Sequence, residues 1–309
     1  MADREESIVA AARAAGSITG TTTAVGVIGW PVEQSLSPVI HNAAFAALGL
    51  DWAYVPLPVG PDSLLTAVAG LRALGFAGAN VTMPHKEEAA SACTVLSEDA
   101  ELVGAVNTLV VGADGWEGHN TDVAGFGRFL AKDAGFDPGG RSALIYGAGG
   151  AARACIAAVV RAGSGTVNVV ARHRARANLA LAMGESLGGD VRTANWHAEA
   201  PAGADLVINA TPVHGDLLPL PPLHAGQVVV DLLYRPTVTP LVARAREAGA
   251  STPPAREAGP ARGGTSGAAR RESGDRHRSR SGNRTGRGAA AGRRRRQRCR
   301  QRPRRGLDR

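Results

Sequence analysis

One lysine stands out among the residues that could do chemistry. Lys86 ends the stretch 80–86 (NVTMPHK), and residues 73–127 contain no other Lys or Arg. Hydroxyl, amide and carboxylate side chains gather in three further segments that follow apolar runs, namely 35–38 (SLSP), 104–108 (GAVNT) and 120–122 (NTD). A positioned ammonium can donate a proton to an oxygen on which negative charge develops, and a nearby carboxylate favours its charged form. The four clusters together predict a site for a small polyhydroxylated acid.

Each cluster also has an ordinary structural interpretation. Asn-Thr pairs commonly form turns, and Ser37 followed by Pro38 is typical of a helix N-cap and the first helical position. Lys86 could be solvated and pair with Glu87 or Glu88 at the start of a helix. The chemical interpretation therefore depends on whether the four clusters meet in the fold.

The strongest local motif lies in the second half of the chain, at 142–152 (SALIYGAGGAA). A buried strand is followed there by a glycine loop and then a helix; the loop consists of Gly147, Ala148, Gly149, Gly150 and Ala151. Glycines let the backbone turn sharply and approach a pyrophosphate, whose charge is held by the N–H groups of the helix N-terminus. Ala152 takes the place of the third glycine, which the dinucleotide-binding pattern permits. The motif predicts a dinucleotide site, and its alternative is an ordinary tight turn.

The residues after the next strand indicate which dinucleotide would bind. The strand at 167–171 ends in 172–176 (RHRAR), and no acidic residue occurs between Gly165 and Met183. An acidic residue near this point would accept from a ribose 2′-hydroxyl, whereas an arginine accommodates a 2′-phosphate. The pattern favours NADP, with Arg172 as the candidate ligand and His173 as a surface residue. The alternative is a solvated helix start with scattered charge.

The order of elements predicts an α/β fold with two domains. Apolar strands alternate with helices along the chain, with strands at 24–29, 142–146, 166–171, 205–209 and 227–231, and helices at 37–48, 61–73, 86–92, 122–132, 150–162, 174–187 and 238–248. Such alternation is typical of parallel sheets with helices on both faces, and a pairing of 105–111 with 115–119 is also expected. We predict an N-terminal α/β substrate domain over 21–121 and a doubly wound, Rossmann-type dinucleotide-binding domain over 122–250.

The charge of the chain is distributed unevenly. The net charge is +8, but residues 251–309 hold 19 Arg, no Lys and four acids, which leaves the first 250 residues with 16 basic and 23 acidic residues. Residues 251–309 contain one large apolar residue, Leu307, and are predicted to be a disordered basic tail; residues 1–20 are predicted to be a loose leader. Arginine without lysine is typical of a GC-rich gene read out of frame, a hypothesis that an intact-protein mass would test.

Composition excludes several classes of protein. No apolar run is long enough for a membrane span, and the start of the chain is acidic rather than signal-like. Three distant cysteines, Cys93, Cys155 and Cys299, form neither a metal-ligand spacing nor a disulfide framework. The tail would bind phosphates without sequence preference but has no aromatic residue for base stacking, so no specific nucleic-acid partner is expected. We predict a cytoplasmic enzyme of small molecules without a metal.

Over residues 24–250 the combined motifs closely resemble the shikimate dehydrogenase family, whose members reduce 3-dehydroshikimate with NADPH in aromatic amino-acid and chorismate biosynthesis. The resemblance implies that Lys86 and Asp122 form the catalytic pair. It implies substrate contacts from Ser35, Ser37, Thr82, Asn107 and Tyr234, with the two serines at the carboxylate. It implies cofactor contacts from the glycine loop (Gly147, Ala148, Gly149, Gly150, Ala151), Arg172, Thr211 and Leu232. A monomer or a homodimer is expected.

After residue 250 the sequence departs from that family. The family continues with a strand, a substrate-contacting glutamine and helices that pack on the N-terminal domain, whereas Gln297 and Gln301 lie among arginines. Two alternatives therefore stand beside the main hypothesis: a catalytically impaired homologue, and a quinate/shikimate dehydrogenase of the same fold. An arginine-rich nucleic-acid-binding protein is a third, disfavoured alternative from another class.

Overall fold

The structure, a computed structural model, describes residues 18–253, which lie within one compact unit. The predicted leader and tail lie outside the described residues, apart from residues 18–20 and 251–253. Ser251 differs from the prediction of a tail that starts at 251, because it forms a β-bridge with Val228. Its N–H donates to the carbonyl oxygen of Gln227 (2.8 Å) and its carbonyl oxygen accepts from the N–H of Val229 (2.9 Å).

The N-terminal sheet has six strands in the order β2-β1-β3-β5-β6-β4. The strands are β1 (Thr23–Gly29), β2 (Trp52–Pro58), β3 (Gly78–Val81), β4 (Cys93–Leu96), β5 (Thr108–Val111) and β6 (Trp116–His119). β1 is parallel to β2 and β3, but β5 runs antiparallel to both β3 and β6. The prediction of parallel sheets is therefore wrong here, because a short turn, not a crossover helix, joins β5 to β6. The expected pairing of these two segments is confirmed.

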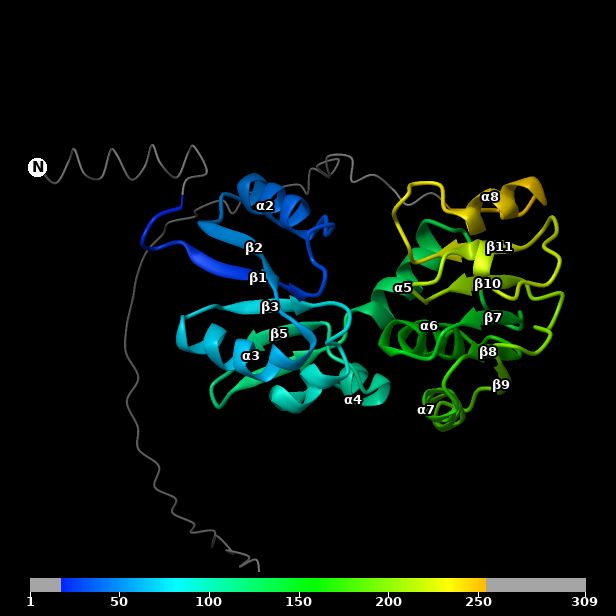
Figure 1. Cartoon of the computed structure of the whole chain (residues 1–309), viewed down its shortest axis with the longest axis horizontal. Coiled ribbons are helices and arrows are strands. Elements are labelled where there is room, and N and C mark those ends of the chain that lie inside the picture. Colours follow the sequence, from blue (N-terminus) through cyan, green and yellow to red (C-terminus); the bar gives the residue numbers. More distant parts are fainter. Residues whose placement is uncertain (1–17, 254–309) are drawn as a thin grey trace, which may run out of the picture. The chain divides into compact units, whose positions relative to one another are not determined.

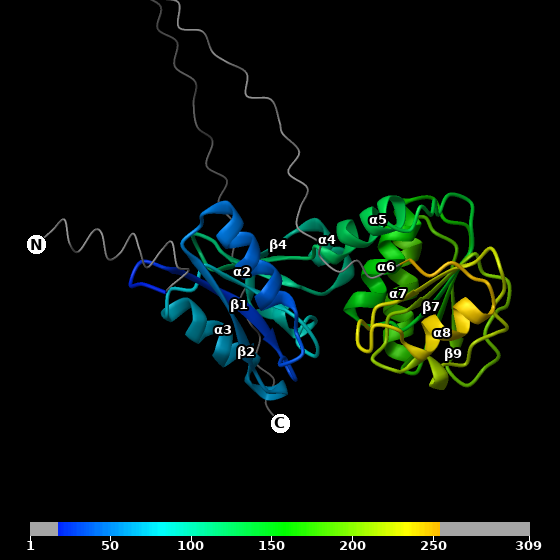
Figure 2. The ribbon, with the colours of Figure 1, turned by 90° about the horizontal axis from the view of Figure 1, so that it is seen from above.

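Three helices belong to this part of the chain: α2 (Ser37–Leu48), α3 (Leu64–Ala73) and α4 (Glu98–Val103). Figures 1 and 2 show α2 and α3 on opposite faces of the sheet, as expected for successive crossovers that move in opposite directions from β1. The predicted N-cap is wrong, since Leu36 is the cap residue and Ser37 and Pro38 are the first helical positions. The helix predicted over 86–92 is a 3₁₀ helix over Glu88–Ala92, and a second 3₁₀ turn covers Pro61–Ser63.

The C-terminal sheet has five strands, all parallel, in the order β11-β10-β7-β8-β9. The strands are β7 (Ala143–Tyr146), β8 (Val167–Ala171), β9 (Val191–Asn195), β10 (Leu206–Asn209) and β11 (Val228–Asp231). The helices are α5 (Asp122–Lys132), α6 (Gly150–Arg161), α7 (Arg174–Ser186) and α8 (Pro240–Glu247), with a 3₁₀ turn at Gly215–Leu217. The predicted doubly wound sheet is confirmed, with the predicted elements at nearly the predicted bounds. β9 was not predicted.

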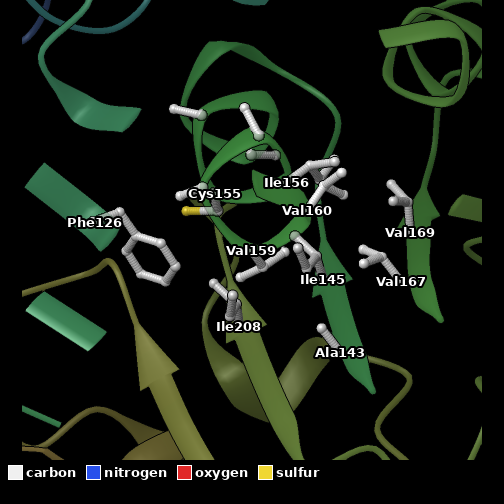
Figure 3. Packing of buried hydrophobic residues seen from close by; sticks show 14 of the residues in the cluster. Phe126, Ala143, Ile145, Cys155, Ile156, Val159, Val160, Val167, Val169 and Ile208 are labelled. Carbon is white, nitrogen blue, oxygen red and sulfur yellow. The ribbon is translucent and has the colours of Figure 1, made fainter. Parts of the chain in front are cut away.

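Alternate residues of the C-terminal strands face two separate cores. Ile145 and Ile208 point toward α5 and α6, where Phe126 and Ile156 pack against them (Figure 3). The intervening residues, such as Leu144 and Tyr146, face α8 in a second core. Burial on both faces explains why these strands read as continuous apolar runs in the sequence. The sheet is thus held rigidly under the loops at its carboxyl edge.

Residues 18–253 contain neither a candidate membrane span nor a candidate metal cluster. No helix in this range is long and apolar enough to cross a membrane. No group of three His, Cys, Asp or Glu side chains in the same range could hold a metal ion.

Candidate active site

The structure brings Lys86 and Asp122 together, although 36 positions separate them. The Lys86 Nζ donates to the Asp122 Oδ2 at 2.7 Å, and the two side chains keep 21% and 33% of their surface exposed. Lys86 lies in the loop after β3, and Asp122 is the first residue of α5. The predicted alternative, a pairing of Lys86 with Glu87 or Glu88, is wrong. The pair combines an ammonium that can donate a proton with a carboxylate that orients it.

Both carboxylate oxygens of Asp122 are held. Oδ1 accepts from the Asn107 Nδ2 at 2.8 Å, which leaves Oδ2 for Lys86. The backbone N–H of Asp122 donates to the Asn120 Oδ1 at 3.0 Å. Asn107 and Asn120 are themselves buried. These asparagines belong to the clusters found in the sequence, and here they fix the direction in which the carboxylate points.

From Asn107 a chain of polar side chains continues toward the start of α2. Thr108 Oγ1 donates to Asn107 Oδ1 (2.9 Å), and Asn80 Nδ2 donates to Thr108 Oγ1 (3.1 Å). The Tyr54 hydroxyl donates to Asn80 Oδ1 at 2.6 Å. Burial raises the pKa of Tyr54 to about 12, and a hydrogen bond with the Ser37 side chain offsets part of this rise. Ser37 and the Lys86–Asp122 pair are therefore linked through one polar network.

The backbone around Lys86 is anchored on both sides. The Lys86 carbonyl oxygen accepts from the Val106 N–H at 2.7 Å, and the Thr82 N–H donates to the Ile28 carbonyl oxygen at 2.8 Å. The ring of His85 is buried, and its Nε2 lies 2.7 Å from the Val59 carbonyl oxygen. The side chain of Lys86 thus extends from a fixed main chain.

A hollow of about 510 Å³ runs from Lys86 to the glycine loop and beyond. Its wall contains Thr82, Met83, Pro84, Lys86, Glu87, Gly147, Ala148, Gly149, Gly150, Ala151, Ala171, Arg172, His173, Arg176, Trp196, Ala210, Thr211 and Pro212. Asp122 is not in that wall, but Lys86 and the predicted cofactor residues of the loop border one space. Its volume lies within the range of ordinary ligand pockets.

Two glycines of the loop occupy positions where the surrounding chain leaves no room for a side chain. Gly147 has φ of +114°, and a Cβ there would lie 3.0 Å from the Ala210 carbonyl oxygen. A Cβ on Gly150 would lie 2.8 Å from the Ala105 Cβ. The N-terminus of α6 has no side-chain cap, so its first N–H groups are free of a capping side chain. Such a helix start is a ready binding site for an anion.

Two arginines lie where the hollow meets the end of β8. The guanidinium of Arg172 stacks over the ring of Trp196, with its central carbon 4.8 Å from the ring centroid. Arg176 lies in the first turn of α7 and pairs with Glu87 at 3.4 Å. A positive pair on an aromatic wall fits a ribose 2′-phosphate beside an adenine ring. The donor set therefore fits NADP.

Some predicted residues lie elsewhere. Ser35 and Ser37 lie at the start of α2, where the Ser37 N–H donates to the Ser35 Oγ at 3.2 Å. Tyr234 is 49% exposed and Leu232 36% exposed, and neither lines the hollow. Asn107 donates to Asp122, and neither of these two residues lines the hollow. The substrate role of Tyr234 and the cofactor role of Leu232 stay predictions.

Sequence reasoning missed four residues of this region: Glu87, Arg153, Arg176 and Trp196. Arg153 lies in a helix that reads as alanine-rich, and nothing local indicates that it is buried against Glu87. Arg176 belongs to the basic run 172–176, but the sequence does not show which of Arg174 and Arg176 would lie at the site.

Comparison with known proteins agrees with this geometry. The profile described as the shikimate dehydrogenase substrate binding domain matches residues 27–109. A shikimate dehydrogenase (NADP(+)) from Geobacter sp. (strain M21) is 46% identical over 244 residues, which cover 75% of this chain and 84% of the relative. This chain belongs to the shikimate dehydrogenase family. The predicted family is thus confirmed.

Solved structures of the family have the same fold. A shikimate dehydrogenase crystallised with NADP+ superposes with a TM-score of 0.68 at 35% identity, covering 76% of this chain and 85% of that one. A quinate dehydrogenase from Corynebacterium glutamicum in complex with NAD gives a TM-score of 0.66 at 31% identity, covering 75% and 88%. The family therefore includes neighbours with different named substrates and cofactors.

Proposed function

We propose that this protein catalyses the reversible, NADP-dependent reduction of 3-dehydroshikimate to shikimate, a step of chorismate and aromatic amino-acid biosynthesis. The observation that carries the proposal is the Lys86–Asp122 pair, 2.7 Å apart, beside the hollow that also contains the glycine loop. A proton donor and a dinucleotide site then border one space. The match to shikimate dehydrogenases over most of the chain supports the substrate.

In the reductive direction, NADPH supplies the hydride that reaches the ketone carbon. The Lys86 ammonium stabilises the negative charge that develops on the ketone oxygen and donates its proton to that oxygen. The neutral amine then takes up a proton from solvent, which reaches Lys86 because 21% of its side chain is exposed. In the oxidative direction the neutral amine removes the hydroxyl proton. Asp122 orients the ammonium through the 2.7 Å contact between its Oδ2 and the Lys86 Nζ.

Substrate contacts are assigned to polar groups on the N-terminal side. Ser35 and Ser37 hold the substrate carboxylate, and Thr82, Asn107 and Asp122 contact the ring hydroxyls. Tyr234 completes this set. The polar chain from Ser37 through Tyr54 to Asn80 supports the assignment, because it connects the serines to the residues around Asp122.

Cofactor contacts are assigned to the opposite wall. The glycine loop 147–151 and the open N-terminus of α6 bind the pyrophosphate, and Arg172 binds the 2′-phosphate. Thr211 lies in the wall of the hollow near Gly147, which supports a place near the nicotinamide, and Leu232 is assigned to the same pocket. The basic end of β8, which has no acidic residue, supports NADP over NAD.

Substitution of the two lysines of the chain tests the proposed role of Lys86. The sequence contains only two, Lys86 and the exposed Lys132 of α5. We expect purified protein to reduce NADP+ when shikimate is added, and Lys86→Ala to lower kcat by about 10²–10⁴-fold, the usual contribution of proton-transfer catalysis, with a smaller change in KM. Lys132→Ala is the matched control and should be unchanged. A rise in KM alone for Lys86→Ala would make Lys86 a binding group and contradict the proposal.

Quinate is the second candidate substrate, because a quinate dehydrogenase is among the structural neighbours. The paired serines and Arg172 favour shikimate with NADP. Values of kcat/KM for shikimate and quinate, each with NADP+ and NAD+, decide between the two. If kcat/KM for quinate with NAD+ equals or exceeds that for shikimate with NADP+, the protein is a quinate dehydrogenase instead.

The proposal extends to organisation and partners. Residues 21–121 act as the substrate domain and 122–250 as the cofactor domain of a cytoplasmic monomer or homodimer. No specific nucleic acid or membrane takes part, and the charge of residues 251–309 acts only non-specifically. Light scattering measures the oligomeric state. A salt titration of nucleic-acid binding, repeated after deletion of 251–309, tests the role of that charge.

A further inference from the structure

Arg153 is a buried cation at the end of the first turn of α6, and the proposed chemistry does not use it. Only 4% of its surface is exposed. Its Nε donates to the Val103 carbonyl oxygen at 2.6 Å, and one terminal nitrogen donates to the Ala148 carbonyl oxygen at 3.0 Å. The other terminal nitrogen is 3.3 Å from both the Gly104 carbonyl oxygen and the Glu87 Oε1. One guanidinium therefore holds the end of α4, the glycine loop and the segment of Lys86.

The bond to Ala148 determines how the glycine loop presents its next N–H group. In a trans peptide the carbonyl oxygen and the N–H point in opposite directions. Because Arg153 holds the Ala148 carbonyl oxygen on its own side, the Gly149 N–H is turned away from Arg153, and Gly149 lines the hollow whereas Arg153 does not. A rotated peptide would put an oxygen there, and that oxygen would repel a pyrophosphate.

Glu87 connects this arginine to the catalytic segment. Its two oxygens pair with Arg153 (3.3 Å) and Arg176 (3.4 Å), so one carboxylate serves two cations of the C-terminal region. Burial lowers the pKa of Arg153, and the charge of Glu87 opposes that shift. Glu87 also follows Lys86 directly, and the Lys86 carbonyl oxygen is fixed by the Val106 N–H. Movement of Glu87 would therefore move the base of the Lys86 side chain.

We propose that Arg153 and Glu87 are positioning residues, which turn the Gly149 N–H toward the cofactor's pyrophosphate and hold Lys86 in register with the glycine loop. The inference rests on the proposed function, and it assigns to these residues no contact with substrate or cofactor. Their effect passes through the Ala148–Gly149 peptide and through the main chain at Lys86.

The test compares two arginines of the same helix. In Arg153→Lys a single ammonium cannot reach the four acceptors, so we expect the Kd for NADP+ to rise about 10–100-fold, as for loss of one hydrogen bond to a charged group. Arg161→Lys is the matched control, because Arg161 pairs with Asp99 and Glu98 of α4 and does not line the hollow. It should leave the Kd unchanged.

A ligand without a pyrophosphate separates positioning from general damage. Adenosine 2′-monophosphate offers the adenine and the 2′-phosphate but nothing for the glycine loop. We expect Arg153→Lys to bind it as tightly as the wild type while losing affinity for NADP+. Titrations can follow the fluorescence of Trp196, which lines the hollow. Equal losses for both ligands would overturn the proposal.

Glu87→Gln keeps the test decisive if Arg153→Lys fails to fold. The amide retains an acceptor for Arg153 but loses the charge that both arginines share. We expect kcat for shikimate oxidation to fall several-fold and its KM to change little. Unchanged kcat and unchanged Kd for NADP+ in folded Glu87→Gln would overturn the inference. Wild-type protein that binds NADP+ without oxidising shikimate would instead contradict the proposed function. The Kd values for NADP+ of Arg153→Lys, Arg161→Lys and the wild type would still test the positioning role of Arg153.

Discussion

Two twelve-residue helices, α2 and α6, are packed in opposite ways. Ten residues of α6 are buried, whereas none of α2 is. α6 is built mainly from Ala, Val and Ile and packs against α5, α7 and the central strand β7. α2 lies over the edge strand β2 and leaves Val39 70% and Leu48 72% exposed.

The contrast assigns different tasks to the two helices. α6 begins at the glycine loop, so its rigid packing fixes the N–H groups that we propose bind the cofactor. α2 begins at Ser37, and the buried cluster beneath it contains only Val25, Val27, Val32 and Tyr54. We therefore expect changes in α6 to act on stability and on the cofactor together, and changes at the start of α2 to act on the substrate alone.

The largest difference is expected from apolar truncation in the two helices. Ile156→Ala removes a fully buried side chain from α6 and should lower the free energy of unfolding by about 2–5 kcal/mol. Val39→Ala in α2 should change it by less than about 0.5 kcal/mol, because Val39 is exposed. Urea unfolding of both variants measures this. Similar losses would show that α2 is as firmly packed as α6.

Ser37→Ala tests whether the start of α2 acts on the substrate alone. Loss of a hydroxyl donor to a carboxylate should raise the KM for shikimate about 10–100-fold. The Kd for NADP+ should stay the same, because Ser37 does not line the hollow. Ser91→Ala, at an exposed serine outside the site, is the control. A change in both constants would mean that the two walls are coupled through Tyr54 and Asn80.

Arg172→Gln tests the cofactor wall with a smaller effect. The Kd for NADP+ should rise about tenfold, the lower end for a charged hydrogen bond, since Arg172 is exposed. The Kd for NAD+ should not change, and the exposed neighbour Arg174 provides the control substitution. If the Kd values for NADP+ and NAD+ rise equally, Arg172 contacts the pyrophosphate or the adenine and not the 2′-phosphate.

The smallest expected effect is a difference in pH dependence between the two regions. Burial lowers the pKa of His41 in α2, where its ring stacks on Tyr54 with centroids 4.2 Å apart. As the pH falls, His41 therefore becomes protonated in the unfolded state before it does so in the folded state. The free energy of unfolding then falls as the pH drops below 6.5. His41→Phe keeps the aromatic ring and should remove this slope. Urea midpoints measured at pH 7.5 and at about 5.5 compare the variant with wild type.

In the C-terminal region the corresponding group is Asp205. Hydrogen bonds from the Ser142 N–H and hydroxyl, both 2.8 Å, lower its pKa. Its contribution is complete above pH 3.8 and is lost as pH falls toward the lowered value. In Asp205→Asn the pH dependence of the free energy of unfolding should therefore change only at acidic pH, near and below 3.8. An altered slope near pH 6 in this variant would contradict the assignment to separate regions.

Local sequence patterns predicted most elements because each depends on its own residues. α2 and α5 begin and end at the predicted residues, and the run VINATP correctly marks the end of β10. Strand β9 (VRTAN) was missed because it is a polar edge strand, in which three of five residues are exposed. The antiparallel return of β5 was not foreseen as part of the larger sheet, because strand order depends on contacts distant in sequence.

For the site, the sequence by itself determined the chemical groups: an ammonium at 86, a carboxylate at 122, a glycine loop and a basic end to β8. Composition and spacing are sufficient for that, since each motif is complete within a few residues. Only the tertiary structure decided that Lys86 pairs with Asp122 rather than with Glu87, and that Glu87 joins Arg153 and Arg176. Partners of a charge are chosen by the packing of separate segments, and no local pattern encodes that choice.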